Sequence, residues 1–173
     1  MVFKKLSGLA VLAGLLCAFV VTPGLAVAQA GDKVLAAADV QKLVPDRVWY
    51  KGQAAPSQTR NSGGVKFADG SFMLATLVDT SGYSSDVQAK YQAYFIAESP
   101  LKIGGQSLPA GIYGAGFIGD NKFVVTDVGG HDVLTVSSST DAAMTRPRPL
   151  RVNADPAGGF RLYAGRKYVT FSK

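Results

Sequence analysis

Short runs of apolar and β-branched residues, separated by turn-forming residues, fill the chain from Val65 onward. Such runs are typical of β-strands joined by tight turns. The predicted strands are Val65–Phe67, Ser71–Val78, Ala93–Glu98, Leu101–Ile103, Gly111–Ile118, Lys122–Val128, Asp132–Ser137, Leu150–Val152, Arg161–Ala164 and Tyr168–Phe171. The pattern lacks the repeated helical segments of an α/β enzyme. It predicts a mainly β fold, either an antiparallel β-sandwich or a small barrel, with one or two short helices.

The region before these strands has a mixed pattern. Leu35–Leu43 carries apolar residues at helical spacing and is predicted to be a helix that Pro45 ends. Arg47–Lys51 follows as a strand, and the polar, turn-rich Gly52–Gly64 is predicted to be a loop. A second short helix is predicted from Ser84 to about Gln92, with serine and aspartate at its start.

The N-terminus has the pattern of a secretory signal peptide. Lys4 and Lys5 precede the uncharged apolar run Leu6–Val21, and Ala28-Gln29-Ala30 supplies the small-residue pattern of a cleavage site. We therefore expect cleavage after Ala30 and export to a periplasm or the cell exterior. Cleavage after Ala28 and retention as an anchor are the alternatives, although the run is shorter than the about 20 residues that span a bilayer.

Cleavage would leave residues 31–173 as one β domain without a transmembrane span and without cysteine, since Cys17 is the only cysteine. Disulfides, thiolate metal sites and cysteine nucleophiles are thereby excluded from the mature chain. Loss of Lys4 and Lys5 leaves 16 basic and 12 acidic residues, a formal charge of +4. Residues 146–173 hold seven basic residues and one acidic residue. This basic region is either a solvated surface or a site that attracts anionic partners.

One short segment resembles a known kind of domain. Leu108-Pro109-Ala110-Gly111-Ile112-Tyr113 reads as a turn that opens a strand. It is similar to a turn in secreted bacterial β-sandwich domains of unknown function, which implies a sandwich and no particular functional residue. In the strand that follows, Gly114 and Gly116 share one face and mark either the close approach of another backbone or a gap for a ligand.

Candidate chemistry centres on a predicted hairpin. A two-residue turn at Gly129-Gly130 would place Val125 opposite Leu134, Phe123 opposite Val136 and Asp127 opposite Asp132. Two facing carboxylates need relief from solvent, from an arginine or from a cation such as Ca²⁺, so Asp127 and Asp132 are a candidate metal site. His131 and Ser107 are the candidate base and nucleophile of a hydrolase, although the Ser107 segment lacks the strand-to-helix elbow.

The leading hypothesis is an exported, non-catalytic protein that binds a protein, a glycan or an anionic envelope component, with no cofactor and no nucleic acid as ligand. Its expected surface combines the 52–64 loop, one of the two residues Trp49 and Tyr50, and the basic C-terminal strands. A carrier of a small apolar ligand, with a cavity near Tyr113, is the first alternative, and a small hydrolase is the second. The candidate ligand-binding residues are Trp49, Tyr50, Tyr113, Arg161 and Arg166.

Overall fold

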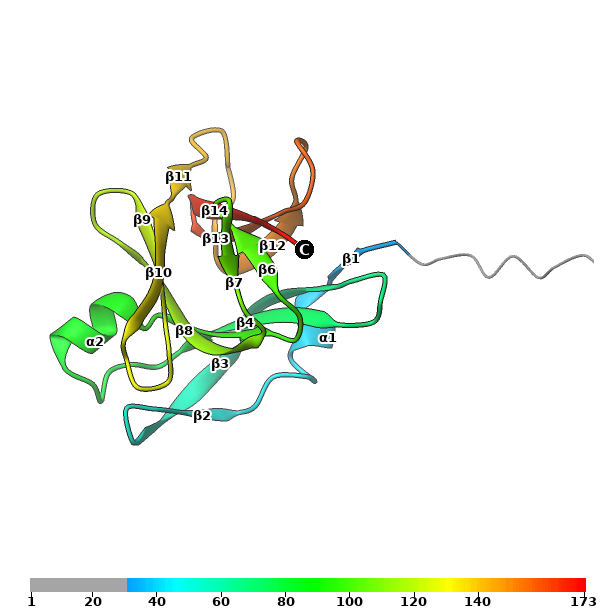
Figure 1. Ribbon diagram of the computed structural model, residues 1–173. Helices are drawn as coiled ribbons and strands as arrows, with labels where there is room; N and C mark the ends of the chain where they lie inside the picture. Colours follow the sequence, from blue (N-terminus) through cyan, green and yellow to red (C-terminus); the bar gives the residue numbers. More distant parts are fainter. Residues whose placement is uncertain (1–30) are drawn as a thin grey trace, which may run out of the picture.

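Two antiparallel sheets pack face to face in the computed structural model, which describes residues 31–173 (Figure 1). The predicted signal peptide, residues 1–30, lies outside the described residues. The larger sheet has the strand order β1-β3-β4-β5-β8-β9-β10, with β2 paired to β3, and the smaller sheet has the order β12-β13-β14-β6-β7, with β11 paired to β14. The predicted mainly β, antiparallel fold is confirmed, and the sandwich alternative is the one observed.

The strands are short except for one. The elements are β1 Lys33–Leu35, α1 Ala37–Val40, β2 Arg47–Tyr50, β3 Gln53–Lys66, β4 Phe72–Val78, α2 Ser85–Lys90, β5 Ala93–Ala97, β6 Leu101–Ile103, β7 Gln106–Leu108, β8 Gly111–Ile118, β9 Lys122–Thr126, β10 Asp132–Ser137, β11 Ser139–Thr140, β12 Arg148–Ala154, β13 Phe160–Gly165 and β14 Lys167–Ser172.

The main core lies between the sheets. Alternate residues of each strand point inward, because successive side chains in a strand lie on opposite faces. Phe95, Phe123 and Val125 of the larger sheet are buried there against Leu162 and Val169 of the smaller one. Burial of a large apolar side chain contributes about 1.5–3 kcal/mol to folding, so this layer supplies most of the stabilisation.

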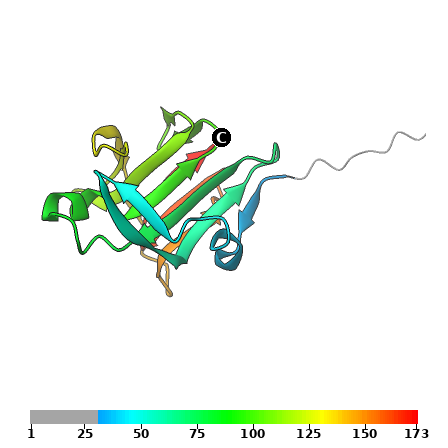
Figure 2. The ribbon, with the colours of Figure 1, turned by 90° about the horizontal axis from the view of Figure 1, so that it is seen from below.

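The opposite face of the larger sheet is covered by the N-terminal part of the chain (Figure 2). Val40 of α1 packs on Leu74 of β4. The β2–β3 hairpin and α2 cover the rest through a tyrosine cluster, in which the ring centroids of Tyr50 and Tyr91 lie 3.8 Å apart and nearly parallel. Tyr50 also shares a 3.0 Å hydrogen bond with Thr126 of β9. The hairpin is thus fixed to the sheet by buried aromatic contacts.

Two predictions for the N-terminal region are wrong. The predicted helix at Leu35–Leu43 is reduced to α1 and a following turn, because Leu35 pairs with β3 as the end of β1. The predicted loop at Gly52–Gly64 is most of β3, the longest strand. The first half of β3 has one exposed face with polar residues, so its sequence resembles that of a loop. Gly63 marks a close approach, since a Cβ there would lie 2.7 Å from the backbone nitrogen of Val152.

The predicted β9–β10 pairing is correct in the strands and wrong at the turn. Val125 lies opposite Leu134 and Phe123 opposite Val136, as predicted. Three residues, not two, connect Asp127 to His131, and Gly130 adopts a φ of 87°. This is the three-residue hairpin loop that places a glycine in the left-handed region. A bulge then brings Asp132 opposite Thr126, so the two aspartates do not face each other.

Candidate functional site

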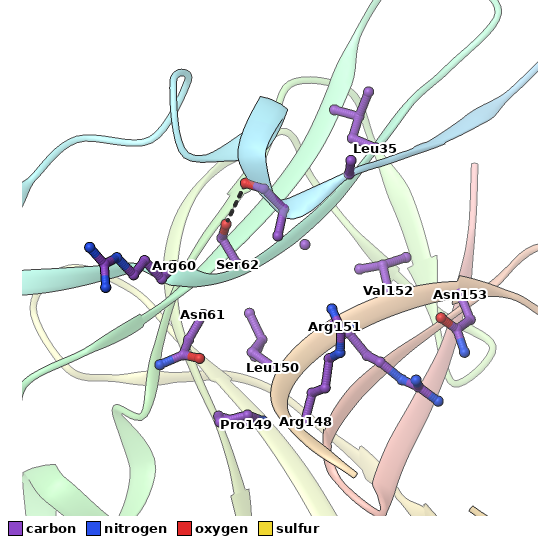
Figure 3. Close-up of a pocket in the computed structure, with 13 residues that line it drawn as sticks. Leu35, Arg60, Asn61, Ser62, Arg148, Pro149, Leu150, Arg151, Val152 and Asn153 are labelled. Atoms are coloured by element: carbon purple, nitrogen blue, oxygen red, sulfur yellow. Dashed lines mark hydrogen bonds between the residues drawn. The ribbon is translucent and has the colours of Figure 1, made fainter. Parts of the chain in front are cut away.

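A cleft of about 370 Å³ lies where a bend in β3 faces β12 (Figure 3). We call it the basic cleft, because three arginines line it and none of the described residues lining it is acidic. Arg60 lies on the β3 side, whereas Arg148 and Arg151 come from β12. The cleft therefore joins the segment predicted to be a loop and the basic C-terminal region, which are far apart in the sequence.

The bend in β3 has a local cause. The pairing with β4 is interrupted between Gln58 and Ser62, so three residues bulge out of the sheet. Ser62 fixes this bulge because its buried hydroxyl donates to the carbonyl oxygen of Thr59 at 2.7 Å. The same hydroxyl lies 3.4 Å from the carbonyl oxygen of Ala37 (Figure 3). The bulge carries Arg60 and Asn61 to the rim of the cleft.

The β12 side of the cleft is also irregular. The pairing of β12 with β13 shifts between Arg148 and Arg151, and Pro149 lies within that shift. Proline cannot donate a backbone hydrogen bond, which suits it to a bulge. Arg148 and Arg151 lie at the two ends of this shift, in the edge strand β12, and both line the cleft.

The cations of the cleft have no carboxylate partner within residues 31–173. Arg60 and Arg148 are exposed and form no ion pair there. Arg151 is held in place by Tyr163, whose ring centroid lies 5.2 Å from the guanidinium carbon, and by Met144, whose sulfur lies 3.5 Å from Nη2. Its buried Nε has no hydrogen-bond partner. Guanidinium groups in this state are suited to binding carboxylate or phosphate oxygens.

The other predicted arginines have structural contacts. Arg161 pairs with the nearly buried carboxylate of Asp155 through two contacts of 3.0 Å, and its guanidinium carbon lies 4.5 Å from the centroid of the Tyr168 ring. The hydrogen bond from Arg161 holds the pKa of Asp155 below its usual value. Arg166 donates from Nε to the carbonyl of Met144 at 3.2 Å. Neither arginine lines the basic cleft.

The three predicted aromatic residues have different environments. Trp49 has 68% of its surface exposed, whereas Tyr50 has 3% and is part of the tyrosine cluster. The prediction that one of these two neighbours faces solvent is therefore confirmed. Tyr113 belongs to the main core and donates its hydroxyl to the carbonyl of Pro109 at 3.0 Å. Of the three, only Trp49 presents an exposed ring.

The residues proposed for metal binding or hydrolysis do not form one site. Asp132 pairs with Lys90 at 2.7 Å, and Asp127 accepts from the backbone N–H of His131 and contacts its ring Nδ1 at 3.0 Å. Those bonds lower the pKa of Asp127. Ser107 lies in β7 of the other sheet and forms no hydrogen bond with His131. Residues 31–173 contain no group of three or more His, Cys, Asp or Glu that could hold a metal ion.

The interior near Tyr113 offers little space for an apolar ligand. The cavity beside Ala115 and Phe117 measures about 10 Å³, whereas carriers of small molecules enclose several hundred Å³. The glycines of β8 are in close contact with their neighbours: a Cβ at Gly114 would lie 2.5 Å from the Tyr91 ring, and one at Gly116 would lie 2.2 Å from the carbonyl oxygen of Lys90. The prediction of a close backbone approach is therefore confirmed at Gly116.

Sequence reasoning missed the two exposed cations of the cleft. Arg60 lies inside the segment predicted to be a loop, and Arg148 was counted in the basic region 146–173 without being named as a ligand-binding residue. The signal that could have found them is the absence of acidic residues near either one in the sequence.

No protein-family model, curated protein or solved structure matches the chain. The resemblance of Leu108–Tyr113 to secreted β-sandwich domains stays a prediction, and in the structure this segment joins β7 to β8. None of the helices described in residues 31–173 is long and apolar enough to cross a membrane.

Proposed function

We propose that this chain is an exported, non-catalytic protein that binds an anionic component of the cell envelope in its basic cleft. One observation carries the proposal: Arg60, Arg148 and Arg151 all line one cleft that has no acidic lining residue, and none of the three pairs with a carboxylate in residues 31–173. Unpaired like charges repel one another, so a shared site of this kind is stabilised by an anion.

The export part of the proposal rests on the sequence of residues 1–30. The non-catalytic part is supported by the contacts of the candidate catalytic groups. His131 is exposed and paired with Asp127, and Ser107, in β7, forms no hydrogen bond with either of them. A binding role needs only the exposed cations that the cleft presents.

The test compares two double variants of residues 31–173 that lose the same charge. Arg60→Gln with Arg148→Gln removes the two exposed cations of the cleft. Lys102→Gln with Lys122→Gln removes two exposed cations outside it. Binding of galacturonate, inorganic phosphate and phosphatidylglycerol vesicles is measured by calorimetry at about 0.15 M salt, where the screening length is about 8 Å.

We expect at least one probe to bind the wild type and to lose affinity at least tenfold in the arginine double variant. The lysine double variant should bind within twofold of the wild type. Equal losses in the two variants would show attraction to net charge alone and would refute the site. Absence of binding by all three probes would refute the anionic ligand class.

A further inference from the structure

The outward face of the β2–β3 hairpin leads to the basic cleft. Side chains alternate along each strand, so the buried residues Val48, Tyr50 and Ala55 face the sheet and the residues between them face away. We define the hairpin face as the outward-facing set Arg47, Trp49, Ala54, Pro56 and Gln58. In the pairing of the two strands Arg47 lies opposite Pro56 and Trp49 lies opposite Ala54, so these residues are neighbours on one surface.

A hydrogen bond joins this face to the cleft. The side-chain amide of Asn61, which lines the cleft, donates to the side-chain oxygen of Gln58 at 3.0 Å. Arg60 lies between these two residues at the rim. From Ala54 to Gln58 the strand advances by about 13 Å at about 3.3 Å per residue, and the bulge that carries Arg60 follows directly. Along β3 the hairpin face therefore leads to the rim of the basic cleft.

The chemical character of the side chains changes from the cleft to the far end of the hairpin face. The cleft end is cationic, the middle carries amide side chains at Gln58 and Asn61, and the far end carries an exposed indole beside Arg47. Amides both donate and accept hydrogen bonds, as hydroxyl groups require. An exposed indole offers a flat apolar surface for stacking. None of the residues of the hairpin face is acidic.

We propose that the ligand of the basic cleft is an acidic oligosaccharide, which continues along the hairpin face and stacks a sugar ring on Trp49. This inference rests on the proposed function, because the cleft must first bind the carboxylates. A lipid headgroup would use the cleft alone and would leave the amides and the indole without a role. A chain of sugars with carboxylates and hydroxyls matches all three parts of the surface.

The single tryptophan of the chain makes a direct experiment possible, since its emission reports on the hairpin face alone. Residues 31–173 are titrated with galacturonate and with hexagalacturonate, and tryptophan emission and calorimetric heats are recorded together. A methyl-esterified hexagalacturonate serves as the uncharged control. Trp49→Ala and Arg47→Gln are the test variants, and Lys122→Gln is the control variant.

We expect the hexamer to bind at least tenfold more tightly than the monomer and to shift the Trp49 emission to shorter wavelength. Trp49→Ala should retain monomer affinity and lose the gain of the hexamer, and Arg47→Gln should lose part of it. The esterified hexamer should bind at least tenfold more weakly than the acidic one.

The two proposals fail in different ways. Equal affinity for monomer and hexamer with unchanged emission, or binding of phosphatidylglycerol vesicles without binding of either sugar, would overturn the oligosaccharide and leave the anion-binding cleft standing. Anion binding that persists undiminished in the Arg60→Gln, Arg148→Gln double variant would overturn the cleft itself. A hexamer that binds the Trp49→Ala variant as tightly as the wild type would overturn the path over the hairpin face.

Discussion

Replacing Arg161 with leucine should destabilise the protein and leave anion binding intact, because this arginine is engaged with Asp155 and Tyr168. The Asp155 side chain is 4% exposed and the Arg161 side chain 24% exposed, and two N–O contacts of 3.0 Å join them. A hydrogen bond to a charged group contributes about 1.5–3 kcal/mol, and a cation over an aromatic ring at a partly exposed site adds about 0.5–1 kcal/mol. We expect a total loss of about 3 kcal/mol and a Tm lower by about 10 °C.

The pH dependence gives this prediction a second test. In the folded state the hydrogen bond from Arg161 lowers the pKa of Asp155. In the unfolded chain the pKa of aspartate is about 3.9. The contribution of the pair is therefore fully present above about pH 4 and is lost as the pH falls through the lowered folded pKa. The difference in unfolding free energy between wild type and variant should shrink below pH 4.

Urea unfolding of the wild type, Arg161→Leu, Asp155→Asn and the double variant, at pH 7 and at pH 3, isolates the coupling between the two side chains. The reasoning is refuted if the coupling at pH 7 is below about 0.5 kcal/mol, since that is within the error of additivity. It is also refuted if Arg161→Leu weakens anion binding as strongly as Arg148→Gln, because Arg161 would then act in the basic cleft.

Three further predictions concern other parts of the chain. Gly116→Ala should cost about 1–3 kcal/mol in urea unfolding because the new methyl group would meet a backbone carbonyl of α2, whereas Gly119→Ala, with open space around it, should be within about 0.5 kcal/mol of the wild type. The hydrogen bond from Lys173 lowers the pKa of Asp69 to about 2. An NMR titration should therefore find this carboxylate ionised down to that pH, and Lys173→Met should raise its pKa. Mass spectrometry of the protein recovered from its expressing cells should find a chain that begins after Ala30; an intact N-terminus would contradict the predicted cleavage.

Local patterns in the sequence were sufficient to predict most strands from Val65 onward, but not β1 or the first part of β3. Apolar alternation in β9 and β10 gave the correct pairing of Val125 with Leu134, because a register that is wrong by one residue would expose the core face. The same reasoning failed at the turn, where the number of loop residues depends on the backbone angles of Gly129 and Gly130.

The basic cleft could not be predicted in this way. Its two sides, Arg60 and Arg148, are brought together by a bulge in β3 and by another in β12. The bulge in β3 has no clear sequence signal, and Pro149 in β12 does not indicate which strand its neighbours will face. Likewise, the alternation of Trp49 and Tyr50 showed that one of them is exposed, but only the tyrosine cluster decides which. Long-range packing, which a local pattern does not contain, determines both features.

The hydrogen bond between Tyr50 and Thr126 spans 76 residues of chain, so the hairpin reaches its final place only after β8 and β9 have joined the sheet. Contacts of such long sequence separation form late, because the loop must close before they stabilise anything. The β2–β3 hairpin and its outward face, with Trp49, are therefore fully fixed only once Thr126 of β9 is in the sheet.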